Sequence, residues 1–283
     1  ICQLVQHNAL DAATKGFEDA LKDKLGDSVK IIEQNASGDV ATCITIVNGF
    51  VSSNVDLIMA NATPALQAAQ AATGDIPILG TSVTDYGTAL GMENFTGTTG
   101  VNISGTSDLA PLDQQANMIM ELFPSAKKVG MLYCSAEANS VYQVNIIKAA
   151  LESHGIKCQD FAFSDSNDVS AVTANACSWS DVIYIPTDNT AASCTETIRN
   201  VVEPAKIPVV AGEEGICKGC GVATLSISYY DLGYRTGEMA AEILGGSDVS
   251  TMPIQYAPKF TKEYNAELCS ILGVEVPEDY VAI

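Results

Sequence analysis

Acidic and amide side chains gather in three short segments in the second half of the chain, each just after an apolar run. These residues are Glu137, Asn139 and Ser140, then Asp188, Asn189 and Thr190, then Glu213 and Glu214. Carboxylates in such segments suit an ammonium group, because hydrogen bonds between charged partners are the strong ones. Each carboxylate alone would also fit a solvated surface residue, and Asp188 would also fit a cap on the helix that follows.

The equivalent segments of the first half are rich in hydroxyl and amide groups. They hold His7 and Asn8, then Thr63 and Pro64, then Thr84, Asp85 and Tyr86. Thr63-Pro64 is a helix-start signal, with the threonine as N-cap and the proline at the first helical position. A helix start can hold a carboxylate on its free amides, although a simple capped helix is the commoner meaning.

Arginine is scarce, which limits how an anion could be bound. The chain has two arginines, Arg199 and Arg235, both in predicted helices away from these segments. An anionic ligand would therefore be bound by amides and hydroxyls. Together with the acidic segments, this predicts a site for a zwitterion.

Several classes of function are excluded by motif and by charge. The sequence has no HExxH, GxSxG, P-loop or EF-hand pattern, and its two histidines, His7 and His154, cannot form a multi-histidine site. We therefore predict no catalytic residue, no metal and no cofactor. Lys and Arg total 14 and Asp and Glu total 34, a net charge of −20 that repels nucleic acid. No apolar run reaches the roughly 18 residues of a membrane span.

The nine cysteines are mostly flanked by apolar or small residues, which predicts buried thiols. Cys217 and Cys220 form a CxxC pair, for which three glycines nearby predict a tight turn. The spacing leaves two free thiols, a local disulfide and a redox role open. A lone CxxC is weak evidence for zinc.

Short β-rich runs alternate with longer helical patterns along the whole chain. Predicted strands are Cys2–Gln6, Val29–Gln34, Val55–Ala60, Ile78–Gly80, Val129–Tyr133, Lys157–Phe163, Val182–Ile185, Val209–Ala211 and Val222–Ser226. Predicted helices include Ala9–Leu25, Ala65–Ala72, Asp113–Leu122, Val141–His154 and Leu232–Leu244. This alternation predicts βαβ units, an α/β fold and parallel sheets.

An internal repeat predicts two similar lobes. The segment from Asn54 to Pro64 matches the segment from Ser180 to Thr190 in its order of Asp, apolar strand and small polar loop. Each is followed by an Ile-Pro strand, at Ile76 and at Ile207. We expect residues 1–107 with 229–257 in one lobe and 108–228 with 258–283 in the other. Because ligands of parallel sheets lie beyond the carboxyl ends of strands, we expect the polar segments to line a cleft between the lobes.

Many of these segments resemble the tryptophan/tyrosine-binding lipoprotein group of ABC-transporter substrate-binding proteins. The resemblance spans nearly the whole chain in the right order. The matching pieces are residues 6–12, 62–65, 83–85, 137–141, 186–190, 212–215, 229–233 and 253–256.

The resemblance implies a type I periplasmic-binding-protein fold, with two Rossmann-like lobes joined by three hinge crossovers. It implies no enzymatic activity, an aromatic amino acid as ligand and an ABC permease as partner. It also implies an extracytoplasmic place, periplasmic or at the cell surface, with membrane contact only through a lipid anchor that would precede Ile1. Thr63, Thr84 and Ser140 would meet the ligand carboxylate, and Asp188 with Glu213 the ammonium. Tyr86, Tyr133 or Tyr230 would flank the aromatic side chain.

Three other functions stay open at this point. A sugar or nucleoside binder on the same fold is disfavoured by the scarcity of arginine and by the single tryptophan, Trp179. An α/β enzyme using a carboxylate pair has no motif to support it. A ligand-sensing domain of a receptor is disfavoured because this chain shows no DNA-binding or membrane segment.

Overall fold

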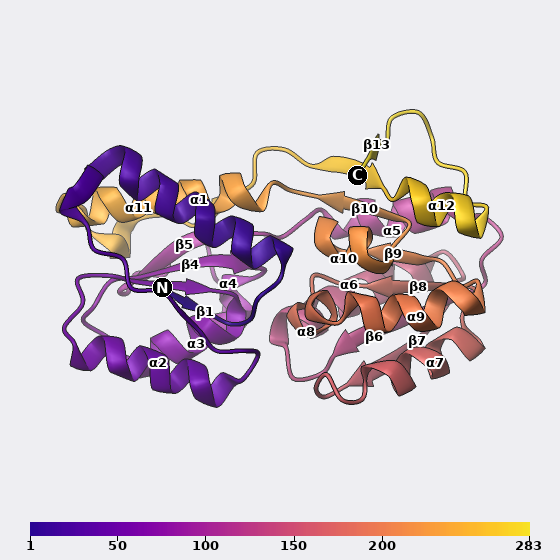
Figure 1. Cartoon of the computed structure of the whole chain (residues 1–283), viewed down its shortest axis with the longest axis horizontal. Helices are drawn as coiled ribbons and strands as arrows, with labels where there is room; N and C mark the ends of the chain where they lie inside the picture. Colours follow the sequence, from indigo (N-terminus) through magenta and orange to yellow (C-terminus); the bar gives the residue numbers. More distant parts are fainter. The chain divides into compact units, whose positions relative to one another are not determined.

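The computed structural model describes residues 1–283 and contains two compact units, each built on one sheet (Figure 1). Unit 1 comprises residues 1–109 and 228–258, and unit 2 comprises residues 110–227 and 259–283. The chain therefore passes between the units three times, after residues 109, 227 and 258. The crossings expected from the sequence, after residues 107, 228 and 257, lie one or two residues away.

Unit 1 contains a parallel sheet of order β11-β5-β4-β3-β1-β2. Its strands are β1 Cys2–Gln3, β2 Gln34–Asn35, β3 Ile58–Asn61, β4 Ile78–Val83, β5 Ile103–Ser107 and β11 Gln255–Tyr256. Its helices are α1 Asn8–Leu25, α2 Val40–Ser52, α3 Thr63–Ala72, α4 Tyr86–Leu90 and α11 Tyr229–Leu244, with 3₁₀ turns η1 Gly26–Ser28 and η2 Val249–Thr251. Helices α1 and α11 cover one face of the sheet and α2 and α3 the other (Figure 1).

Unit 2 contains a sheet of order β13-β12-β10-β9-β8-β6-β7, parallel except where β12 runs against β10. Its strands are β6 Lys128–Cys134, β7 Lys157–Phe163, β8 Val182–Ile185, β9 Val209–Ala211, β10 Ala223–Ser226, β12 Thr261–Tyr264 and β13 Val281–Ala282. Its helices are α5 Leu112–Leu122, α6 Ala138–Ser153, α7 Val169–Trp179, α8 Asn189–Ser193, α9 Thr195–Ala205, α10 Glu214–Cys220 and α12 Ala266–Leu272. No helix in either unit combines the length and the apolar character that crossing a bilayer requires.

The two sheets share one strand order, β4-β3-β1-β2 in unit 1 and β9-β8-β6-β7 in unit 2. The repeated sequence pattern falls on equivalent strands, because it covers β3 and β8 and the Ile-Pro dipeptides precede β4 and β9. The predicted α/β fold with parallel sheets is confirmed.

Two local predictions are wrong. The strand predicted over residues 29–34 contributes only Gln34 to β2. The CxxC pair lies inside helix α10 instead of a turn, because Glu213 caps that helix and Gly219 packs against the side chain of Thr195. Both thiols are buried and free, as are those of Cys2, Cys43, Cys134 and Cys269, while the other three cysteines are free and partly buried.

Close packing of α1 against α11 depends on glycine. A Cβ atom on Gly233 would lie 1.9 Å from the backbone oxygen of Ala13, and one on Gly16 would lie 2.1 Å from the backbone oxygen of Tyr230. The contact brings Tyr230 to Asp19, with 3.0 Å between the phenol oxygen and the carboxylate. Residues 228–258 are therefore an integral layer of unit 1.

Gly233→Ala is expected to lower the free energy of unfolding by about 1–3 kcal/mol, because the backbones of α1 and α11 must move apart. Gly49→Ala in α2 is the matched control, since a Cβ there meets nothing within 4 Å; it should stabilise by roughly 0.5–1 kcal/mol. Urea unfolding followed by circular dichroism measures both. Equal effects of the two substitutions would contradict the close-packing argument.

Candidate functional site

Three helices begin beside one another at the carboxyl edge of each sheet. In unit 1, α1, α3 and α4 follow β1, β3 and β4, and their N-cap residues are His7, Ala62 and Asp85. In unit 2, α6, α8 and α10 follow β6, β8 and β9, and their N-cap residues are Glu137, Asp188 and Glu213. Because the first amides of a helix lack partners within the helix, these edges are where acceptors or anions are needed.

Glu137 stabilises the start of a neighbouring helix and not of its own. Its carboxylate accepts hydrogen bonds from the backbone and side chain of Asn189, at 3.0 and 2.7 Å, and from those of Thr190, at 2.9 and 2.8 Å. A fifth donor is the amide of Asn139 at 3.2 Å. A carboxylate has about four lone-pair sites, so this one is saturated by the protein.

Asp188 is buried and caps α8. Its carboxylate accepts from the amides of Ala191 at 2.8 Å and Cys134 at 2.7 Å, and from the hydroxyl of Ser140. Burial, together with the charge of Glu137, raises the pKa of Asp188 above its ordinary 3.8, against the opposing effect of these hydrogen bonds. Three donors leave about one acceptor position for a further partner.

Glu213 and Glu214 differ in their surroundings. Glu213 is 2% exposed and its carboxylate accepts from the amides of Gly215, at 2.7 Å, and Ile216. Glu214 is only partly buried and pairs with Lys218 one turn further on. The loops before α8 and α10 touch, since a Cβ on Gly212 would lie 2.4 Å from the backbone nitrogen of Thr187. The buried Glu213 thus belongs with Asp188, and Glu214 lies at the margin.

Asn139 adds an acceptor to this edge of unit 2. Its amide nitrogen donates to Glu137, Ser140 and the backbone oxygen of Thr187, while its Oδ1 atom is buried without a hydrogen-bond partner. A buried acceptor without a donor is costly, so this oxygen is suited to a donor from outside the protein.

Helix α3 in unit 1 begins at Thr63, one residue before Pro64, the predicted first helical position, and two residues before the predicted range Ala65–Ala72. The N-cap is Ala62, with φ 95° and ψ 156°, and it provides no side-chain cap. Thr63 and Pro64 are the first two helical residues, so the prediction of Thr63 as N-cap is wrong. The Thr63 side chain is 2% exposed and its hydroxyl has no hydrogen-bond partner.

Ser82 carries a second buried hydroxyl without a partner, and sequence reasoning did not single it out. It has φ 55°, is 6% exposed, and lies where the pairing of β4 with β5 shifts register. The adjacent residue Thr81 pairs with Asn61 at the end of β3, so Ser82 near the end of β4 and Thr63 just after β3 lie at neighbouring strand ends. Two hydroxyls and the uncapped start of α3 therefore gather at one edge.

Thr84, Asp85 and Tyr86 each have a hydrogen-bond partner within the protein. The Thr84 hydroxyl donates to Asp108 at 3.0 Å, and the Asp85 carboxylate accepts from the amide of Thr88 at 2.7 Å. Tyr86 is buried in the core, with its hydroxyl donating to the backbone oxygen of Thr106 at 3.1 Å. His7 and Asn8 open α1, where His7 is half-buried and Asn8 exposed.

Neither arginine reaches the carboxyl edges. Arg199 in α9 pairs with Glu203 and Glu267, and Arg235 in α11 pairs with Glu238 and Glu242. Tyr230 was predicted to flank the ligand side chain. It lies on α11, and its hydroxyl donates a hydrogen bond to the Asp19 carboxylate. The strand ends thus separate into a donor-rich edge in unit 1 and an acidic edge in unit 2.

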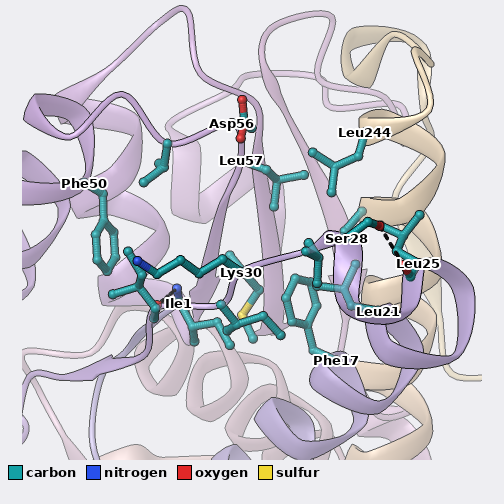
Figure 2. Close-up of a pocket in the computed structure, with 16 residues that line it drawn as sticks. Ile1, Phe17, Leu21, Leu25, Ser28, Lys30, Phe50, Asp56, Leu57 and Leu244 are labelled. Atoms are coloured by element: carbon teal, nitrogen blue, oxygen red, sulfur yellow. Dashed lines mark hydrogen bonds between the residues drawn. The ribbon is translucent and has the colours of Figure 1, made fainter.

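A cavity of about 530 Å³ lies elsewhere in unit 1. Figure 2 shows its largely apolar lining, which includes Phe17, Leu21 and Phe50. Residues preceding β1 and β3, namely Ile1 and Leu57, also line it. It therefore lies at the amino ends of the strands and is separate from the edge that carries Thr63 and Ser82.

Comparison with known proteins agrees with this architecture. A family model described as ABC transporter substrate binding protein matches residues 1–282. This chain belongs to that family. Members of this family are substrate-binding proteins of ABC transporters.

Three relatives illustrate the likeness. A "Tyrosine-binding protein" of Clostridioides difficile is 40% identical over 257 residues, covering 90% of this chain and 74% of the relative. An ABC domain from Streptococcus pneumonia, solved in complex with L-Trp, is 31% identical with a TM-score of 0.94, covering 100% of this chain and 99% of that one. A conserved domain protein from Vibrio cholerae is 33% identical with a TM-score of 0.95, covering 99% of this chain and 97% of that one.

The raised pKa of Asp188 predicts a pH-dependent stability. The folded protein holds this proton more tightly than the unfolded chain, so the contribution of Asp188 to stability grows as pH falls through its folded pKa towards 3.8 and is lost as pH rises. We compare the free energy of unfolding of the native protein with that of Asp188→Asn. The native value minus the variant value should increase by about 1 kcal/mol or more as the pH is lowered from about 9 to about 5.

Urea unfolding at each pH provides this difference. Asp165→Asn, at an exposed position of unit 2, controls for the loss of one charge. A difference for Asp188→Asn that stays flat across the range would show that burial does not perturb this carboxyl.

Proposed function

We propose that this protein captures a free aromatic amino acid outside the cytoplasm and delivers it to an ABC permease. Family membership supports the transport role. The relatives described as tyrosine-binding and as a complex with L-Trp support the aromatic class of ligand.

The separation of donors and acceptors between the units is the observation that carries the ligand chemistry. Unit 1 presents the uncapped start of α3 with the unpartnered hydroxyls of Thr63 and Ser82. These groups suit the α-carboxylate, because amides at a helix start and hydroxyl donors both favour an anion. Unit 2 presents buried carboxylates and an unpartnered amide oxygen, which suit the α-ammonium.

Asp188 and Asn139 are assigned to the ammonium in this proposal. Asp188 keeps about one free acceptor position and Asn139 Oδ1 has no donor. Glu213 lies on the adjacent loop and adds negative charge. Glu137 is assigned a supporting role, since five donors from the protein already saturate it.

Binding would proceed by closure of the two units on the ligand, with the three crossings of the chain as the hinge. A zwitterion suits this mechanism, because each unit would contribute the groups for one charged end. Removing either end of the ligand should therefore weaken binding independently of its aromatic ring.

Calorimetric titration tests the ligand. L-tyrosine, L-tryptophan or L-phenylalanine is expected to bind in the micromolar range or tighter, and tyramine, which lacks the carboxylate, at least about 10-fold more weakly.

Thr63→Val and Ser82→Ala should each weaken binding of the amino acid by about 10- to 100-fold, because each removes a hydrogen bond to a charged group. Neither should further weaken binding of tyramine.

Thr45→Val is the matched control, since this hydroxyl lies exposed on α2. Unchanged affinity in both Thr63→Val and Ser82→Ala would refute the carboxylate assignment and leave the ligand class intact. A sugar that binds while no amino acid does would refute the ligand class.

A further inference from the structure

We propose that Asp108 is a positioning residue that ties the Thr84 loop to two of the three chain crossings, so that the loop and the hinge move together. This inference rests on the proposed function for its meaning, because it links the edge of unit 1 assigned to the ligand carboxylate to the proposed hinge. All the contacts that carry it lie within unit 1.

Asp108 joins its own segment to two others that are distant in sequence, residues 83–84 and Tyr229. Its Oδ1 atom accepts from the Thr84 hydroxyl at 3.0 Å, and its Oδ2 atom accepts from the Tyr229 hydroxyl at 2.9 Å. Its backbone amide donates to the Val83 oxygen at 3.2 Å. Thr84 lies two residues after the bulge at Ser82, so the carboxylate holds the loop that directly follows the strand carrying an assigned ligand residue.

The same loop is held through its backbone. The hydroxyl of Ser107 donates to the Thr84 backbone oxygen at 2.8 Å, and the amide of Leu109 donates to the Ser107 hydroxyl at 3.2 Å. Residues 107–109 thus bind Thr84 by its hydroxyl and its carbonyl. A shift of one segment must move the other or break buried hydrogen bonds.

Position along the chain gives this network its significance. Asp108 lies just before the first crossing, after residue 109, and Tyr229 lies just after the second, after residue 227. One buried carboxylate therefore joins two crossings to a loop at the carboxyl edge of the sheet. Asp108 is 4% exposed, and two hydroxyl groups donate to its carboxylate. Losing either donor would leave a buried acceptor unpaired.

The hydroxyl of Thr84 serves this network instead of a ligand. A hydroxyl has one proton, and that of Thr84 is donated to Asp108. Thr84 therefore cannot donate the same proton to a carboxylate, and its predicted contact with the ligand becomes an indirect one.

Asp108→Asn tests the inference, because the amide has one acceptor oxygen instead of two, so that either Thr84 or Tyr229 loses its acceptor. With L-tyrosine as the probe, the substitution should weaken binding by about 10-fold and change the association and dissociation rates in stopped-flow fluorescence. Thr84→Val should have a similar effect, and the double variant should be no worse than the weaker-binding single variant, since both act through one contact.

Hydrogen exchange of the ligand-free protein provides a readout that needs no ligand. In Asp108→Asn, the amides of the Thr84 loop, of residues 107–109 and of the first turn of α11 should exchange faster together. Thr236→Val is the matched control, because it removes a buried hydroxyl 2.8 Å from that of Thr106 in the same unit. It should lower the melting temperature and leave both the binding rates and the Thr84 loop unchanged.

The outcomes are separable from those of the proposed function. Native protein that binds no aromatic amino acid would refute the proposed ligand, while coupled loosening in hydrogen exchange would still support the role of Asp108. Asp108→Asn with unchanged affinity, unchanged rates and no coupled exchange would overturn the inference, even if its melting temperature falls.

Discussion

The amides in the first turn of a helix need an acceptor, and the two units meet this need differently. In unit 2, Glu137 and Asp188 accept from the first amides of α8, and Glu213 accepts from those of α10. In unit 1, no side chain caps α1 or α3. The same architecture therefore gives unit 2 an acidic edge and unit 1 an edge with free helix-start amides. The charge asymmetry of the proposed site follows from which residues occupy the N-cap positions.

Unit 1 also stores backbone strain where the strands end. Ala62 and Ser82 have positive φ without being glycines, a conformation that costs of order 1–3 kcal/mol each. The surrounding structure holds them: the Ala62 amide donates to the Thr81 oxygen at 3.0 Å, and the bulged β4 packs under the buried ring of Tyr86. Ala62 directly precedes Thr63, and Ser82 itself carries the other unpartnered hydroxyl, so the cost is concentrated where an anion would bind.

Much of the fold could be predicted from the sequence because unit 2 follows simple rules. Strands β7, β8 and β9 are rich in apolar residues and have the predicted bounds. Strand β5 was missed because Ile-Ser-Gly-Thr-Ser reads as a loop; its polar side chains are buried through contacts such as the Thr81–Thr106–Thr236 chain of hydroxyls. Two-residue strands such as β11 and β13 depend on pairing with distant segments and leave no local pattern.

The segments of the candidate site could be located from the sequence, whereas the partners of its single residues could not. Apolar runs followed by Asp, Glu or Thr correctly indicated which loops follow the strands. The conformation of Ser82 and the first residue of α3 could not be predicted from the sequence, because positive φ at a residue other than glycine is imposed by tertiary packing. The commitment of Thr84 to Asp108 depends on a contact between residues 24 apart, which no local spacing reveals.

The layer formed by residues 228–258 bears on how the chain is made. Helix α11 packs against α1 through bare glycine backbone, so the first 109 residues lack one wall of their core until most of the chain has been synthesised. Unit 2 is interrupted in the same way, because residues 259–283, which contain β12 and β13, complete its sheet. Unit 1 can therefore complete its core only after residues 228–258 have been synthesised, and unit 2 only after residues 259–283 have followed. Because domains generally fold as units, neither unit is expected to fold fully from its first segment alone.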